Sequence, residues 1–74
     1  MTEYYLSPES WDSSEYRDIY TRRDMRWLLK NTAGDETWPQ TMNECVDACE
    51  FLGDFSSRER ALKYAQKNYD GVRK

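Results

Sequence analysis

Histidine is absent from this 74-residue chain, and cysteine, glycine and proline are scarce, with two, three and two copies. Without histidine the chain lacks the side chain that most often performs acid–base catalysis near neutral pH. Two cysteines alone cannot supply the four nitrogen or sulfur ligands of a structural zinc site. No glycine-rich phosphate loop or nucleophile elbow is present either. We therefore expect a protein that is not an enzyme, has no catalytic residues and binds no metal or other cofactor.

Long hydrophobic runs are also missing. The longest run of apolar side chains, Trp27 to Leu29, is far too short to cross a bilayer. The first residues do not combine a basic start with an apolar run, as a secretory signal does. We expect a cytoplasmic protein that does not bind membranes.

Aliphatic side chains are few, with two valines, one isoleucine and five leucines, but eleven residues are aromatic. A chain of this length can build only one small core, and aromatic rings bury the most area per side chain. We predict a single domain over residues 1–74 with an aromatic-rich core. Residues 1–6 and 70–74 are expected to be extended or frayed.

The spacing of the apolar residues favours an all-α fold, a small bundle of three or four short helices. The clearest signal predicts a helix over 38–52, because Thr37 and Gln40 have capping-box spacing and Pro39 suits a first helical turn. Gly53 would end this helix. Its inward stripe is Trp38, Met42, Cys45, Val46, Cys49 and Leu52.

Two further helices have similar signals. Thr21 and Asp24 predict a cap for a helix that ends before Gly34, and Ser56 and Glu59 predict a cap for a helix that ends near Tyr69. Their inward stripes are Met25, Leu28 and Leu29 in the first, and Ala61, Leu62, Ala65 and Tyr69 in the second.

The segments before Trp38 have competing interpretations. Residues 16–20 favour another helix, opened by Asp12 or Ser13. Alternatively, residues 25–38 form a small hairpin around a turn at Gly34, which would make the fold α+β.

The two cysteines, Cys45 and Cys49, lie one helical turn apart, which is a poor geometry for a disulfide between them. Free cysteine is commonly buried, so we expect reduced core residues. An intermolecular disulfide or a redox role is the alternative.

Charge is sorted by segment. Residues 35–54 hold six acidic and no basic residues, whereas residues 55–74 hold six basic and two acidic ones. Residues 1–15 add four acids, and residues 16–34 carry five bases against two acids, so the net charge is −3. Such blocks predict surfaces of opposite sign, which influence the choice of partner more than the fold.

On the predicted 38–52 helix the acidic side chains lie opposite the apolar stripe, with one aromatic ring among them. We predict a partner-binding surface formed by Glu44, Asp47, Glu50, Phe51 and Asp54. Phe51 would fill a pocket on a partner whose surroundings are basic. The alternative places Phe51 in the core beneath Phe55.

The last predicted helix carries a basic ridge. Its residues are Arg60, Lys63 and Lys67, flanked by Tyr64. Such a ridge can follow phosphates, and two helices joined by a short turn would resemble a helix-turn-helix that binds DNA.

The sequence therefore favours a small acidic protein–protein interaction module, whose acidic helix occupies a basic, even nucleic-acid-binding, surface of another protein and so inhibits it as a nucleic-acid mimic. In size, acidity and aromatic content the chain is similar to small proteins with which phages disable host enzymes or defence systems. The alternative is a small DNA-binding regulator that uses the basic ridge. Self-association through surfaces of opposite charge is a third hypothesis.

Overall fold

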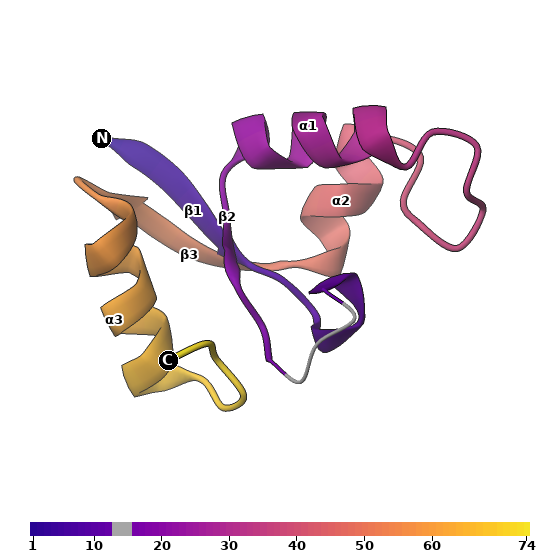
Figure 1. Ribbon diagram of the computed structural model, residues 1–74. Helices are drawn as coiled ribbons and strands as arrows, with labels where there is room; N and C mark the ends of the chain where they lie inside the picture. Colours follow the sequence, from indigo (N-terminus) through magenta and orange to yellow (C-terminus); the bar gives the residue numbers. More distant parts are fainter. Residues whose placement is uncertain (13–15) are drawn as a thin grey trace.

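The computed structural model describes residues 1–12 and 16–74 and contains both helices and a sheet (Figure 1). The elements in chain order are β1 (Thr2–Leu6), a 3₁₀ helix (Glu9–Asp12), β2 (Ile19–Tyr20), α1 (Arg22–Asn31), α2 (Met42–Ala48), β3 (Glu50–Phe55) and α3 (Arg58–Asn68). The fold is α+β, so the expected all-α bundle is wrong.

The three strands form one antiparallel sheet in the order β2-β1-β3. The amino-terminal strand is therefore the central one. Tyr5 and Leu6 pair with Tyr20 and Ile19 of β2 on one side and with residues of β3 on the other. The extended amino-terminal segment thus joins two segments that are distant from it in the sequence.

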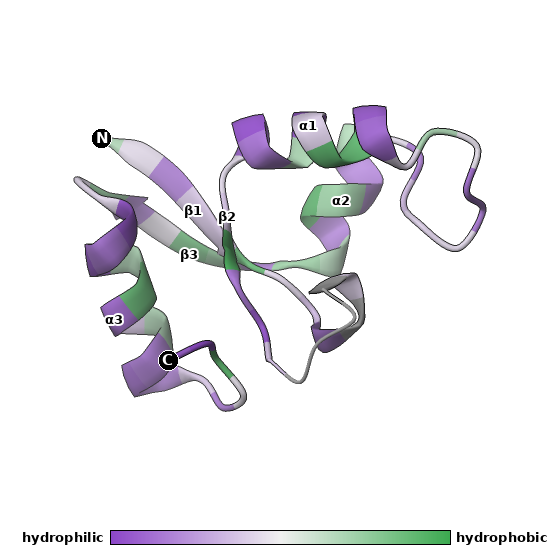
Figure 2. Ribbon diagram, in the orientation of Figure 1, coloured by the Kyte–Doolittle hydropathy of each residue, from purple (hydrophilic) through white to green (hydrophobic). Residues whose placement is uncertain are grey.

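Side chains of β1 alternate between two hydrophobic clusters, one on each face of the sheet. Tyr4 and Leu6 pack with α3, and Tyr5 packs with α1 and α2. Leu6 and Met25 are fully buried in the two clusters. The hydrophobic colours in Figure 2 fall on β2, on β3 and where α1 meets α2, while the 32–41 connection is largely hydrophilic.

The predicted 38–52 helix is only half present. Helix α2 begins after the N-cap Thr41, whose hydroxyl accepts a hydrogen bond from the Glu44 backbone, and it ends at Ala48. Cys49 already has an extended backbone, with φ −105° and ψ 161°. Residues 38–41 precede α2 without helical structure, so the predicted cap at Thr37 is wrong and Thr41 is the N-cap instead. Residues 50–52 belong to strand β3, whose pairing with β1 brings Leu52 into the hydrophobic cluster beneath α3.

A β-bulge interrupts the ladder between β1 and β3. Tyr5 pairs with Phe51 and Tyr4 pairs with Gly53, so Leu52 is the extra residue on β3. Gly53 has φ +122°, a conformation that side chains other than that of glycine rarely adopt. The bulge places Leu52 and Gly53 on the same face and so breaks the alternation by which a strand is recognised in a sequence.

Helices α1 and α3 confirm two of the predictions. Thr21 and Asp24 form a capping box at the start of α1. The alternative of a hairpin over 25–38 is wrong, because α1 extends to Asn31. Helix α3 has its N-cap at Ser57, one residue beyond the predicted position, and its C-cap at Tyr69.

Residues 16–20 are not helical, contrary to the prediction. Ile19 and Tyr20 form β2, and Arg17 bridges Val72 near the carboxyl terminus. A helix start at Ser13 lies outside the described residues. No helix in the described part of the chain has the length and apolar character needed to span a membrane.

Candidate interaction surfaces

The predicted acidic surface is divided between two elements. Glu44 and Asp47 are exposed on α2, and Glu50, Phe51 and Asp54 are exposed on β3. One carboxylate oxygen of Glu44 accepts a 2.6 Å hydrogen bond from the backbone N–H of Gln40, ahead of the helix. The other three carboxylates have no hydrogen bond or ion pair with any residue that the structure describes. They are available to a partner.

Phe51 projects from the face of the sheet opposite to Phe55. Its ring packs on Tyr5, with 5.3 Å between the ring centroids, and the side chain is 54% exposed. Phe55 packs instead against Tyr4 and Tyr64. The alternative in which Phe51 is buried beneath Phe55 is therefore wrong.

Strand β3 is an edge strand. It pairs with β1 on one side, and no described residue forms a backbone hydrogen bond with its other side. Edge strands present a row of free N–H and C=O groups to which another chain can add. β3 contains no proline, which would remove a donor from this row.

The outer end of the β1–β3 ladder places Glu3 directly opposite Asp54. Arg22 lies 3.5 Å from Glu3 and offsets that charge, and within residues 1–12 and 16–74 Asp54 has no cation of its own. Like charges directly opposite each other destabilise a sheet. A cation from outside the molecule would therefore be favoured next to Asp54.

The predicted basic ridge lies on α3. Arg60, Lys63 and Lys67 are exposed, and Tyr64 is 42% exposed with its ring 5.3 Å from that of Phe55. Lys63 is paired with Glu59 at 3.4 Å. The helix-turn-helix resemblance is wrong, because strand β3 separates α2 from α3.

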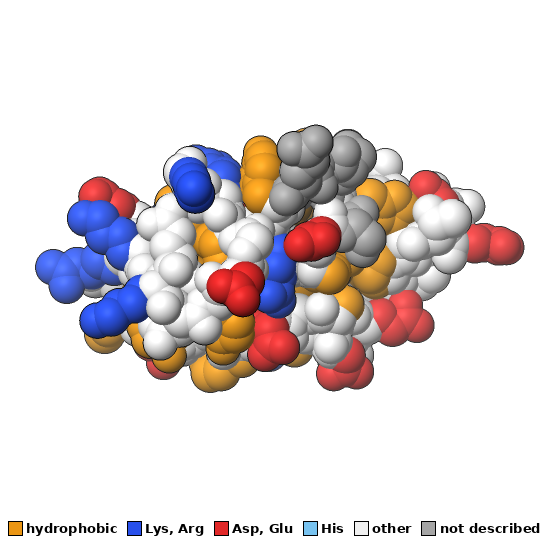
Figure 3. All heavy atoms as spheres, turned by 90° about the horizontal axis from the view of Figure 1, so that it is seen from below, with side chains coloured by type: hydrophobic (Ala, Val, Ile, Leu, Met, Phe, Trp, Pro, Cys, Tyr) orange, Lys and Arg blue, Asp and Glu red, His pale blue; other side chains and the backbone are white. Residues whose placement is uncertain are grey.

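On the face seen in Figure 3, Lys and Arg side chains gather at the end formed by α3, and Asp and Glu side chains lie towards the end where the 32–41 connection is. The acidic residues there include Asp35 and Glu36, which are exposed. A second group of cations belongs to α1, which lies on the other side of the molecule from this view. The charge blocks of the sequence thus become separate surfaces.

A second aromatic ring that is more than half exposed belongs to α1. Trp27 is 67% exposed, whereas Trp11 is buried and Trp38 packs beside it, with 6.2 Å between the ring centroids. The sequence reasoning did not identify Trp27 as a surface residue. The signal was available, because a helix with Met25 and Leu29 inward directs residue 27 outward.

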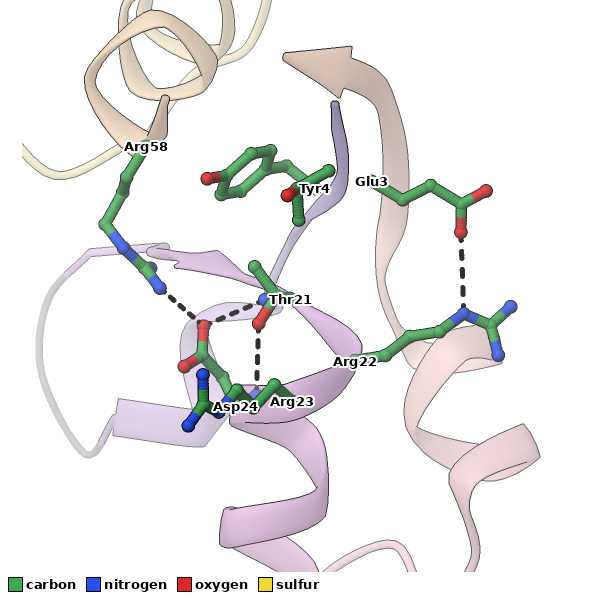
Figure 4. A pocket seen from close by; sticks show the side chains of 8 residues that line it. Glu3, Tyr4, Thr21, Arg22, Arg23, Asp24 and Arg58 are labelled. Carbon is green, nitrogen blue, oxygen red and sulfur yellow. Dashed lines mark hydrogen bonds and ion pairs between the residues drawn. The ribbon is translucent and has the colours of Figure 1, made fainter. Parts of the chain in front are cut away.

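A groove of about 590 Å³ lies where β1, the start of α1 and the start of α3 meet (Figure 4). Arg58 reaches across it to Asp24 at 2.7 Å and also donates a 2.8 Å hydrogen bond to the Ile19 carbonyl. Asp24 in turn accepts a 2.9 Å hydrogen bond from the Thr21 backbone. The polar groups on this side of the groove satisfy one another and tie α3 to α1.

These contacts determine the pKa of Asp24. Partial burial raises it, but the hydrogen bonds from Arg58 and Thr21 and the positive charge of Arg58 outweigh burial, so the pKa of Asp24 is lowered. Asp24 is therefore a carboxylate that stabilises the fold. Its role is structural.

Both cysteines are free thiols in the cluster beneath α1 and α2. Burial, with a smaller contribution from Cys45 and an opposing one from Arg17, raises the pKa of Cys49 to about 12. Burial, followed by the charge of Glu44, raises the pKa of Cys45. Within residues 1–12 and 16–74 no cluster of three or more acidic or cysteine side chains is arranged to hold a metal ion.

Comparison with protein-family models, with curated proteins and with solved structures found no match to this chain. The case for a function therefore depends on the surfaces of the molecule itself.

Proposed function

We propose that this protein is a small protein–protein interaction module that binds a basic segment of a partner through β3 and the neighbouring acidic residues of α2. One observation carries the proposal. On an open strand edge, the half-exposed ring of Phe51 shares one face of the sheet with Asp54, while Glu50 projects from the opposite face, and neither carboxylate has a partner in the described part of the chain.

The open edge favours binding by strand addition. In this mode the partner's backbone supplies affinity through hydrogen bonds, and its side chains supply specificity. Phe51 would act as the anchor, because a ring half-covered by Tyr5 is held in place and still offers a large apolar area.

The charges of β3 select the partner. Pairing β3 with β3 of a second copy would bring two Glu50 and two Asp54 side chains into one ladder without any cation. A segment with lysine or arginine meets complementary charge instead. This argument favours a basic partner over self-association through β3.

Many basic surfaces of proteins bind nucleic acid. A partner held by the acidic face of this protein would lose access to nucleic acid wherever the two sites overlap, and the protein would then act as an inhibitor. A cytoplasmic location, where such partners are abundant, belongs to the same proposal.

The test compares four forms of the protein as bait in nuclease-treated lysate. They are the native chain, Asp47→Lys with Glu50→Lys, Phe51→Ala, and a control in which Lys63→Glu and Lys67→Glu change the charge of α3. A partner should be retained by the native chain and the control, and lost by the acidic-face variant. With that partner purified, Phe51→Ala should weaken binding about tenfold or more.

Stability measurements separate binding from folding. Phe51→Ala should lower the free energy of unfolding by only about 1–2 kcal/mol, because the ring is half-exposed. On binding, amide hydrogens of residues 50–55 should become protected from exchange. Equal retention of every bound protein by all four forms would refute the acidic surface, and unchanged exchange in β3 would refute strand addition.

A further inference from the structure

Helix α1 presents an exposed stripe of three cations beside a tryptophan. Arg23, Arg26, Trp27 and Lys30 follow the spacing i, i+3, i+4, i+7, which places them on one side of the helix. All four side chains are exposed, and Trp27 is the most exposed aromatic ring among the described residues. This surface is separate from β3 and from the proposed function.

The cations of the stripe have no ion pair among residues 1–12 and 16–74. Arg22 and Arg58 nearby have ion pairs with Glu3 and Asp24, but Arg23, Arg26 and Lys30 have none with the residues that the structure describes. Trp27 does not contribute to the core either, because the inward face of α1 carries Met25, Leu28 and Leu29. Leaving so large a ring in water loses the free energy that its burial would contribute.

We infer that this stripe binds a short stretch of single-stranded nucleic acid, with one base stacked on Trp27 and phosphates held by Arg23, Arg26 and Lys30. Sequence-tolerant single-strand sites combine an aromatic ring with a basic path for the backbone. The α1 stripe has both. It is about 10 Å long, given the rise of 1.5 Å per residue, which suits about two or three nucleotides.

Two other partners fit the stripe less well. A helix that lies in a membrane interface inserts an apolar face, and the apolar face of α1 is packed in the core. A protein partner would have to bring an acidic side chain to each of the three cations to avoid burying unpaired charge, whereas a single strand supplies a base for the ring and a row of phosphates for the cations, which lie on one side of Trp27.

The acidic end of the molecule limits the length of nucleic acid that the stripe can contact. Asp35, Glu36 and Asp47 would repel a long polyanion, so contact is confined to a short segment. Bases of a duplex are stacked inside it and cannot cover Trp27. The stripe should therefore prefer a single strand to a duplex.

The probe is a fluorescent oligothymidylate of about ten nucleotides, a length within the usual range of single-strand sites. Its binding is measured at low salt, by fluorescence anisotropy of the oligonucleotide and by quenching of tryptophan emission. A duplex of the same length is the comparison. Trp27→Ala should weaken single-strand binding about 5- to 150-fold, the range expected for one lost stacking contact. Trp27→Phe should recover part of the affinity.

Charge variants test the phosphate contacts. Arg23→Gln with Arg26→Gln should reduce the slope of log affinity against log salt by about 1.4, because each single-strand phosphate contact contributes about 0.7. The matched control Lys63→Gln with Lys67→Gln removes the same charge from α3, where the spacing of Arg60, Lys63, Tyr64 and Lys67 repeats that of the α1 stripe. This control should bind like the native chain.

Several results would overturn the inference. They are absence of binding at low salt, equal binding of single strand and duplex, no effect of Trp27→Ala, or loss of binding only in the α3 control. Binding of the native protein to anionic lipid vesicles without binding to the oligonucleotide would instead assign the stripe to membranes. Because every substituted side chain is exposed, thermal unfolding of the variants should match that of the native chain.

Discussion

Individual side chains of this protein differ widely in their exposure to solvent. Leu6, Met25 and Cys45 are fully buried, while Trp27 and Phe51 keep more than half of their surface in water. Apolar atoms are common on protein surfaces, and aromatic rings are frequent among the residues that contribute most to binding. The cations beside Trp27 and the Asp54 carboxylate on the face of Phe51 give the two rings opposite electrostatic settings.

The thiols give a prediction at the level of single residues. The raised pKa of Cys49, about 12, leaves almost no thiolate at neutral pH. An alkylating reagent should modify Cys49 in the folded protein roughly a thousandfold more slowly than a free cysteine with a pKa of about 8.5. Mass spectrometry of timed samples measures the rate.

The unfolded chain in denaturant serves as the control for alkylation and should react at both cysteines at the ordinary rate. Rapid alkylation of the native protein, or a covalent dimer on non-reducing gels, would support the alternative of a reactive thiol.

At the level of secondary structure, one ion pair, between Asp24 and Arg58, connects α1 to α3. Asp24 also belongs to the capping box at the start of α1. Asp24 accepts hydrogen bonds from the Thr21 backbone and from Arg58. The pKa of Asp24 is lowered in the folded state, so its carboxylate contributes stability above the unfolded pKa. That contribution is lost as the pH falls through the lower, folded pKa.

Asp24→Ala should therefore lower the free energy of unfolding at about pH 7 by about 1–2 kcal/mol, through loss of the cap and of the hydrogen bond from Arg58. The difference from the native chain should begin to shrink below about pH 4, where the carboxyl of the unfolded chain becomes protonated, and should vanish only once the folded carboxyl, whose pKa is lower, is protonated too. Urea unfolding at several pH values measures both. Asp70→Ala is the control, because Asp70 is exposed and has no ion pair in the described part of the chain.

A difference between the Asp24→Ala and native chains that stays constant with pH would contradict this role. It would show that the side chain contributes through packing rather than through its charge.

The whole molecule depends on its first residues. β1 is the centre of the sheet and contributes side chains to both hydrophobic clusters. A chain that lacks residues 1–6 would lose Leu6, Tyr4 and Tyr5 and both strand pairings. We expect it to show no cooperative thermal transition by circular dichroism, since truncation of one buried leucine alone costs about 2–5 kcal/mol.

Removal of Lys74, an exposed residue at the other end of the chain, is the matched control and should leave the transition nearly unchanged. A cooperative transition in the chain without residues 1–6 would contradict the central role of β1. Such a result would mean that β2 and β3 pair in another way.

The predictions of helices from the sequence succeeded where the sequence pattern depends on residues three or four positions apart. The cap formed by Thr21 and Asp24 and the apolar stripe of α3 depend on neighbours along the chain, and both helices were found. The acidic residues of the predicted surface are exposed as expected, although β3 rather than a helix carries three of its five residues. The stripe that continued from Cys45 through Cys49 to Leu52 was misleading, because a bulged strand also turns Leu52 inward.

By itself, the sequence determined the charge blocks, the helices with local caps and the aromatic character of the core, because these follow from composition and from contacts within one helical turn. Only the tertiary structure decided that residues 50–55 form a strand, that the amino terminus occupies the centre of the sheet and that Phe51 lies on an open edge. A strand's hydrogen bonds are made to another segment, here about fifty residues away between Thr2 and Phe55, and that segment cannot be identified from the local pattern of either one.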